Sequence, residues 1–90
     1  MSYAIVYSDK FTDDVRKHKK SGQKKLVGKI TGFIVECQKN PRAGTGKPEQ
    51  LKYRSAETWS RKINEQHRLV YEISENEIFL LSACGHYDDK

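Results

Sequence analysis

The sequence predicts an α+β fold in which two N-terminal helices pack on an antiparallel β-sheet. In the first half of the chain, apolar residues recur every three or four positions, which is the spacing of one face of a helix. In the second half, apolar and polar residues alternate over several short segments, which is the spacing of strands. Strands joined by short turns pair antiparallel, and two helices can cover the apolar face of the sheet. The expected order is therefore β-α-α-β-β-β.

A short strand followed by a helix is expected at the start of the chain. Residues 3–7 form an apolar and β-branched run, and the Ser-Asp step after it is typical of a helix start. The helix predicted over residues 9–20 has a thin apolar face made by Phe11 and Val15. His18 continues this face, so we interpret it as a packing residue and not as a ligand. A Ser-Gly pair then ends the helix.

A second helix is predicted over residues 23–39, and an Asn-Pro pair ends it. Its buried stripe is expected to consist of Leu26, Ile30, Phe33, Ile34 and Cys37. The following stretch, residues 42–49, is rich in Gly and Pro and is predicted to be a loop. Its Gly-Thr-Gly-Lys sequence is not a phosphate-binding P-loop, because Pro41 and Pro48 stand where that motif requires Gly and Ser or Thr.

The rest of the chain is predicted to form strands joined by short turns. Their expected ranges are residues 50–54, 59–64, 68–73 and 78–84. A turn at residues 74–76 joins the last two. The last strand is apolar on both faces, so we expect it to be central in the sheet or well covered. The sheet face away from the helices would carry Lys62 and Arg68, open to a ligand.

The length and cysteine content limit the class of protein. At 90 residues the chain has room for one modest core, and we expect residues 1–90 to form a single domain. No apolar run approaches the roughly 20 residues that span a bilayer, and residues 1–10 do not read as a signal peptide. Cys37 and Cys84 fit no zinc pattern, and the histidines show no metal-ligand spacing. These features favour a reduced, cytoplasmic protein without metal, cofactor or membrane contact.

Positive charge is concentrated in two parts of the chain. The formal net charge is +5, and the stretch between Asp14 and Glu36 contains seven lysines and arginines and no acidic residue. A second basic group lies within residues 47–68. Such asymmetry favours a polyanionic partner, because cations that meet phosphates release condensed counterions. For the first run, a solvated helix face that keeps the protein soluble is an equally good interpretation.

Four residues near the basic strands have the chemistry needed to cleave RNA. Attack by the 2′-hydroxyl requires a base, an acid for the leaving 5′-oxygen and a cation for the charge that grows on the phosphorus, but no metal. Glu49, which is flanked by two lysines, is the candidate base, and His86, which titrates near neutral pH, is the candidate acid. Arg68 offers a planar fork that matches a phosphate. Tyr87 can orient the phosphate or stack on a base.

Each of these residues also has a simpler interpretation. Glu49 among lysines can be a surface ion pair worth ~0–1 kcal/mol, Arg68 can pair with a neighbouring glutamate, and the His-Tyr pair can be an ordinary surface feature. Trp59 fits the core better than a base-stacking platform. His67 has the opposite strand parity to Arg68, so we assign it a structural role. The residues by themselves leave both interpretations open.

Three segments of the chain carry a family resemblance. They are Gly46–Lys52 (GKPEQLK), Trp59–Tyr71 (WSRKINEQHRLVY) and Ala83–Tyr87 (ACGHY). Together they closely resemble the YoeB/Txe toxins of the RelE superfamily, in that family's order and at its spacings. The second segment is specific, the first gives good support, and the third is weak by itself. The preceding strand and helices also fit the family, so the resemblance covers nearly the whole chain.

The resemblance implies a metal-independent endoribonuclease that enters the A site of the small ribosomal subunit and cuts the mRNA codon displayed there. It implies that Glu49 is the general base and His86 the general acid. It also implies that Arg68 stabilises the transition state and that Tyr87 helps to position the scissile phosphate. The basic residues expected to contact RNA phosphates are Lys47, Lys52, Arg61 and Lys62.

The family further implies an antitoxin encoded beside the toxin, and often a homodimer.

Two features depart from the family pattern. The carboxylates of Asp88 and Asp89, which follow the His-Tyr pair together with Lys90, would repel RNA unless they point away. Lys62 stands where arginine is the other common choice, and it offers a point charge instead of a fork. The alternative function is a non-catalytic module of the same fold that binds RNA, the ribosome or the antitoxin.

Overall fold

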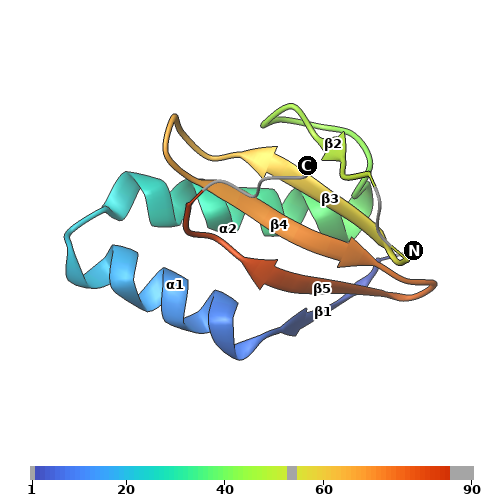
Figure 1. The fold of residues 1–90 in the computed structure, drawn as a ribbon, viewed down its shortest axis with the longest axis horizontal. Helices are drawn as coiled ribbons and strands as arrows, with labels where there is room; N and C mark the ends of the chain where they lie inside the picture. Colours follow the sequence, from blue (N-terminus) through green and yellow to red (C-terminus); the bar gives the residue numbers. More distant parts are fainter. Residues whose placement is uncertain (1, 53–54, 86–90) are drawn as a thin grey trace.

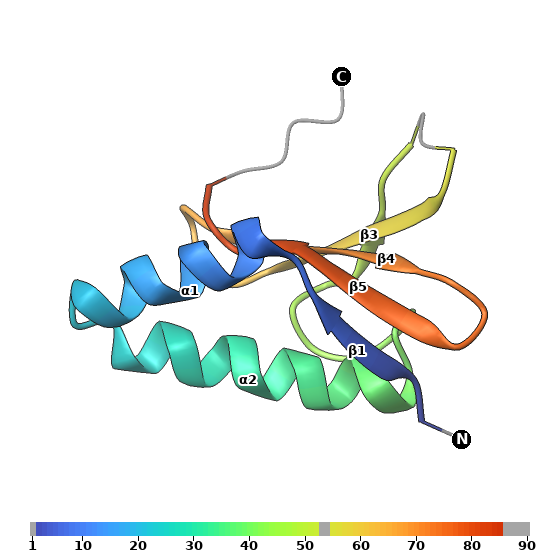
Figure 2. The ribbon, with the colours of Figure 1, turned by 90° about the horizontal axis from the view of Figure 1, so that it is seen from below.

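The computed structural model describes residues 2–52 and 55–85, and these form two helices and a five-stranded sheet (Figure 1). In chain order the elements are β1 (Ala4–Tyr7), α1 (Asp9–Lys20), α2 (Lys24–Lys39), β2 (Glu49–Gln50), β3 (Glu57–Lys62), β4 (Arg68–Ile73) and β5 (Glu77–Ser82). The predicted fold class is confirmed, because the two N-terminal helices pack on one face of the sheet (Figure 2). In the described part of the chain, no helix is long and apolar enough to cross a membrane.

The strand order in the sheet is β1-β5-β4-β3-β2. Strands β2 to β5 form the predicted antiparallel meander. The first strand, however, pairs parallel with β5, with Ile5 opposite Ile78, so the sheet as a whole is mixed and not purely antiparallel. The parallel pairing follows from the connection, because two helices separate β1 from the meander and return the chain to the far side of the sheet. Strand β5 thus lies between two neighbours, as its apolar character predicted.

The core lies between the helices and the sheet. Its buried residues are Phe11, Leu26, Ile30, Phe33, Cys37, Ile63, Leu69, Tyr71, Ile73, Ile78, Leu80 and Ala83. Helix α1 has the predicted bounds, and Ser8 begins it because its hydroxyl accepts the Phe11 N–H. Helix α2 begins at Lys24, one residue later than predicted, because Gln23 is its N-cap.

Several predicted strand ends need correction: β5, for example, ends at Ser82 and not at Cys84, and two other corrections affect the site. Strand β2 consists of Glu49 and Gln50, so the candidate base is itself a strand residue. Of the strand predicted over residues 50–54, residues 51 and 52 fall outside β2, and residues 53 and 54 lie outside the described residues. Strand β3 ends at Lys62 and not at Asn64. The side-chain oxygen of Asn64 accepts the backbone N–H groups of Gln66 and His67. This turn takes the chain out of the sheet.

Candidate active site

Strand pairing brings three of the predicted site residues to one face of the sheet. Lys62 on β3 lies directly opposite Arg68 on β4, and Glu49 on β2 lies opposite Ser60 on β3. Directly opposed residues in an antiparallel pair share a face, and the diagonal neighbour two residues further on is about 7–8 Å away. Glu49, Lys62 and Arg68 therefore form a compact group of one carboxylate and two cations.

This group lies on the face away from the helices. Arg61, the neighbour of Lys62, points the other way, and its guanidinium carbon is 5.8 Å from the centre of the Phe33 ring on α2. Because side chains alternate along a strand, Ser60 and Lys62 point away from α2. Glu49 is exposed, and Lys62 and Arg68 are half-buried, so the face is open to a ligand. The expectation that Lys62 and Arg68 share the open face is confirmed.

The loop that leads to Glu49 is held by the Glu36 carboxylate on α2. One carboxylate oxygen accepts the Thr45 N–H at 2.9 Å, and the other accepts the Thr45 hydroxyl at 2.6 Å. These bonds, first of all the one from the Thr45 hydroxyl, hold the pKa of Glu36 below its ordinary value. The same carboxylate accepts an N–H of Arg61 at 2.8 Å. Glu36 thus ties the loop both to the helix and to β3.

Arg61 completes this attachment from inside the protein. Its side chain has no exposed surface. Its Nε donates to the Tyr71 hydroxyl, one terminal nitrogen donates to Glu36 and to the Thr45 carbonyl, and the other donates to the carbonyls of Asn40 and Ala43. All five N–H donors of the guanidinium are therefore used.

The contacts of Arg61 correct one part of the sequence interpretation. Arg61 was predicted to contact RNA phosphate, but a buried guanidinium with no donor left cannot do so. Its task is structural, because it holds residues 40–45 against the sheet and so positions the strand that carries Glu49. Burial raises the pKa of Tyr71, which keeps its hydroxyl protonated and able to donate to the Pro41 carbonyl at 2.6 Å.

The three lysines assigned to phosphate contact are all accessible, but they differ in setting. Lys47 is exposed, and its backbone has a φ of +49°, in the left-handed region where few residues other than glycine are found. Lys52 is exposed beyond β2. Lys62 makes an ion pair with Glu65 at 2.9 Å, so a phosphate at this position would compete with a carboxylate for its ammonium group.

The described chain ends beside Arg68. The Gly85 carbonyl accepts the Arg68 N–H at 3.1 Å, and the Gly85 N–H donates to Nδ1 of His67 at 2.8 Å. Gly85 has a φ of +79°. The predicted general acid, His86, follows Gly85 directly in the sequence, but His86 and Tyr87 lie outside the described residues, as does the acidic tail.

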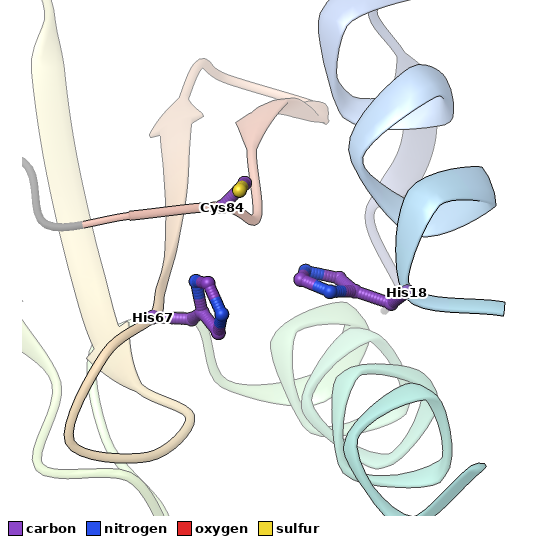
Figure 3. Close-up of side chains that lie close together, drawn as sticks. All are labelled: His18, His67 and Cys84. Carbon is purple, nitrogen blue, oxygen red and sulfur yellow. The ribbon is translucent and has the colours of Figure 1, made fainter. Parts of the chain in front are cut away.

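One cluster with metal-binding chemistry escaped the sequence analysis. His18, His67 and Cys84 come from three separate segments, and each offers one ligand atom within 4.8 Å of the other two (Figure 3). Nothing in the linear spacing indicates this, because the residues lie 49 and 17 positions apart. The ring of His67, a residue assigned a structural role from its parity, meets the ring of His18 on α1 edge to face.

Comparison with known proteins identifies the family of the chain. Residues 7–87 match the YoeB-like toxins of bacterial type II toxin-antitoxin systems. The toxin YoeB of Escherichia coli K12 is 34% identical over 83 residues, which cover 92% of this chain and 98% of that protein.

Solved structures agree with this assignment. A YoeB/ParE toxin from Agrobacterium tumefaciens has a TM-score of 0.86 and 32% identity, covering 93% of this chain and 99% of that one. The YoeB dimer from Staphylococcus aureus has a TM-score of 0.84 and 34% identity, covering 97% of this chain and 100% of that one. The same toxin is known in complex with YefM. The fold, the matched residues and these relatives together show that the chain belongs to the YoeB toxin family of type II toxin-antitoxin systems.

Proposed function

We propose that the protein is a ribosome-dependent endoribonuclease that cleaves mRNA in the A site and so stops translation. The observation that carries the proposal is the strand register, which gathers Glu49, Lys62 and Arg68 on one open face. A carboxylate beside two cations matches the demands of a reaction that removes a proton near a phosphate. Membership in a family of type II toxins also supports a toxic activity of this kind.

The mechanism assigns one task to each group. Glu49 removes the proton of the 2′-hydroxyl, and the freed oxygen attacks the neighbouring phosphorus. The negative charge that grows on the phosphate oxygens is stabilised by Arg68, with Lys62 nearby. The bond from phosphorus to the 5′-oxygen breaks, and His86 donates a proton to this leaving oxygen. The products are a 2′,3′-cyclic phosphate and a free 5′-hydroxyl.

Backbone contacts around Gly85 favour this role for His86. Gly85 is bonded through its carbonyl to the Arg68 N–H and through its own N–H to His67. Gly85, which precedes the proposed general acid in the sequence, is therefore held beside Arg68. Tyr87 follows, and we assign it the orientation of the scissile phosphate.

The ribosome is proposed as part of the active unit because the candidate site is open. Glu49 is exposed on a two-residue edge strand, so the protein offers little to immobilise a flexible single strand. Correct alignment of the reacting atoms contributes much of the rate of such reactions. The decoding site supplies that alignment by holding the codon, and this places the protein in the cytoplasm.

A cognate antitoxin is proposed as the second partner, and a second copy of the toxin as a third. The relatives from Staphylococcus aureus are known as a YoeB dimer and as a YoeB-YefM complex. On this chain an apolar groove between the helices is lined in part by Tyr7, Phe11 and Val35. Tyr7 and Val35 are 57% and 50% exposed, which is unusual for large apolar side chains. Val35→Glu should weaken antitoxin capture in a co-purification; unchanged capture would move the antitoxin site elsewhere.

The cleavage proposal is tested by inducing the toxin in a bacterium without its antitoxin and mapping mRNA 5′ ends by primer extension. We expect new ends inside translated codons, and none in untranslated RNA. Glu49→Ala and His86→Ala should abolish these ends, whereas Glu75→Ala, on an exposed turn, should leave them. Growth arrest or ribosome binding without new ends would contradict catalysis and favour the non-catalytic binding module.

A further inference from the structure

Three side chains that the proposed reaction does not use converge on one point behind the site. His18 comes from α1, His67 from the turn between β3 and β4, and Cys84 from the segment after β5 (Figure 3). The rings of His18 and His67 meet edge to face, with centroids 4.7 Å apart. Cys84 and His67 are half-buried and His18 is buried, so the cluster is reachable from one side.

The hydrogen bond of His18 leaves one ring nitrogen ready to bind a metal. Nε2 lies 2.9 Å from the carbonyl oxygen of Ala83. A carbonyl oxygen can only accept, so Nε2 carries the proton and Nδ1 carries a lone pair. Histidines that bind metals usually donate their other N–H to a carbonyl or carboxylate in this way, which fixes both tautomer and orientation. Because the ring is only 5% exposed, the surrounding packing holds it in place.

His67 differs from His18 in its hydrogen bond, because its ring accepts a backbone N–H instead of donating to a carbonyl. This difference determines what binding of a metal would change. Its Nδ1 accepts the Gly85 N–H at 2.8 Å, so in the metal-free state the ring proton is on Nε2. Figure 3 shows this ring directed toward His18. Binding a metal through Nε2 requires that the proton move to Nδ1, and the bond from Gly85 must then break. A metal and the Gly85 N–H are therefore alternative partners of the same ring.

We propose that His18, His67 and Cys84 bind one Zn²⁺, with water as the fourth ligand. Two imidazoles and a thiolate form a ligand set that zinc accepts, and thiolate excludes the hard cations such as Mg²⁺. Tetrahedral zinc places nitrogen and sulfur ligands about 3.6 Å apart. One nitrogen of each ring and the Cys84 sulfur lie within 4.8 Å of one another, so side-chain movements of about 1 Å bring the three residues to zinc-binding distances. On binding, the Cys84 thiol releases its proton to solvent.

Zinc binding would be coupled to the proposed active site through Gly85. Release of the Gly85 N–H from His67 removes one hydrogen bond that holds Gly85 within the described part of the chain and leaves the bond from the Arg68 N–H to the Gly85 carbonyl. Since His86 follows Gly85, the zinc-bound protein should cleave mRNA more slowly. This consequence rests on the proposed function, whereas the metal site itself does not.

Direct titration of the purified full-length toxin tests the site without any RNA. Co²⁺, a spectroscopic substitute for zinc, should bind at one equivalent and give a thiolate-to-cobalt charge-transfer band that Zn²⁺ removes. Cys84→Ser and His67→Asn should abolish the band, and both positions are accessible enough for the variants to fold. Cys37→Ala, which removes the core thiol, should keep it. Absence of the band in the wild type, or its survival in Cys84→Ser, would overturn the proposal.

Two further measurements test the exchange at Gly85. The amide resonance of Gly85 should shift when Zn²⁺ is added to the wild type and stay in place in Cys84→Ser; an unmoved resonance in zinc-loaded protein would overturn the exchange. In ribosome-dependent cleavage, zinc should lower the rate several-fold in the wild type but not in Cys84→Ser. A toxin that binds cobalt yet never cuts mRNA would contradict the proposed function and leave the metal site standing.

Discussion

Arg61 on β3 donates through Nε to the hydroxyl of Tyr71 on β4, over 3.1 Å, in the buried layer between the sheet and α2. Tyr71 passes the interaction on by donating to the Pro41 carbonyl. The two side chains connect the central strands to the loop after α2, and that loop ends at Glu49. The position of the proposed general base is therefore set by a buried arginine that touches no substrate.

Replacement of Arg61 should destabilise the protein even when the charge is kept. Arg61→Lys supplies three donors in place of five, so loop carbonyls lose their partners. We expect the free energy of unfolding to fall by ~2 kcal/mol, measured by urea denaturation. Arg16→Lys is the matched control, because Arg16 makes an exposed ion pair with Asp13, and it should change stability by less than ~0.5 kcal/mol. Equal effects of the two replacements would contradict the role given to Arg61.

Gly46 should tolerate a side chain far less well than Gly22. It has a φ of +81°, and an added Cβ would lie 2.6 Å from Cζ of Phe33. Gly22 has a similar φ of +75° but nothing within 4 Å. Gly22→Ala should therefore cost ~1–2 kcal/mol from the left-handed backbone alone, and Gly46→Ala should cost ~1–3 kcal/mol more from overpacking.

A helical glycine provides the control for this comparison. Gly28 lies within α2, with no positive φ and open space around its Cα, so Gly28→Ala should stabilise the protein by ~0.5–1 kcal/mol. All three variants can be compared by thermal and urea unfolding. If Gly46→Ala were no worse than Gly22→Ala, the close contact between this loop and Phe33 would be wrong.

The loop attachment should weaken in acid. The pKa of Glu36 is lowered in the folded protein, mainly by the Thr45 hydroxyl, from an ordinary value of 4.5. A lowered carboxylate pKa adds stability that is fully present above the unfolded-state value and is lost as the pH falls through the folded-state value. Stability should therefore drop from about pH 4.5 downward, and Glu36→Gln and Thr45→Val should both reduce the slope. An unchanged slope in Glu36→Gln would exclude Glu36 as a source of this acid sensitivity.

Local features of the fold were predictable from the sequence, and features set by distant contacts were not. Helix α1 has its predicted bounds because Ser8 and a Ser-Gly pair mark its ends within the segment itself. The parallel pairing of β1 with β5 joins residues more than 70 positions apart, and no local pattern encodes it. The cluster of His18, His67 and Cys84 was not predicted for the same reason, because its residues lie far apart in the sequence.

The candidate site shows the same division between local and distant information. Strand alternation correctly put Lys62 and Arg68 on one face, and pairing then added Glu49. Strand alternation places Arg61, the neighbour of Lys62, on the core side, whereas the family resemblance implied a phosphate contact for it. The conflict is resolved by carbonyls of residues 40–45, which supply the partners that allow a guanidinium to be buried. The roles of His86 and Tyr87 stay predictions.

The proposed mechanism depends on Glu49 acting as a base on mRNA held by the ribosome. Purified toxin should be mixed with ribosomes carrying a defined A-site codon, and single-turnover cleavage should be compared for the wild type, Glu49→Gln and Glu75→Gln. We expect Glu49→Gln to lower the cleavage rate by about 10²–10⁴-fold, with ribosome binding and the free energy of unfolding unchanged, and Glu75→Gln to cleave at the wild-type rate. Cleavage by Glu49→Gln at the wild-type rate would contradict this mechanism.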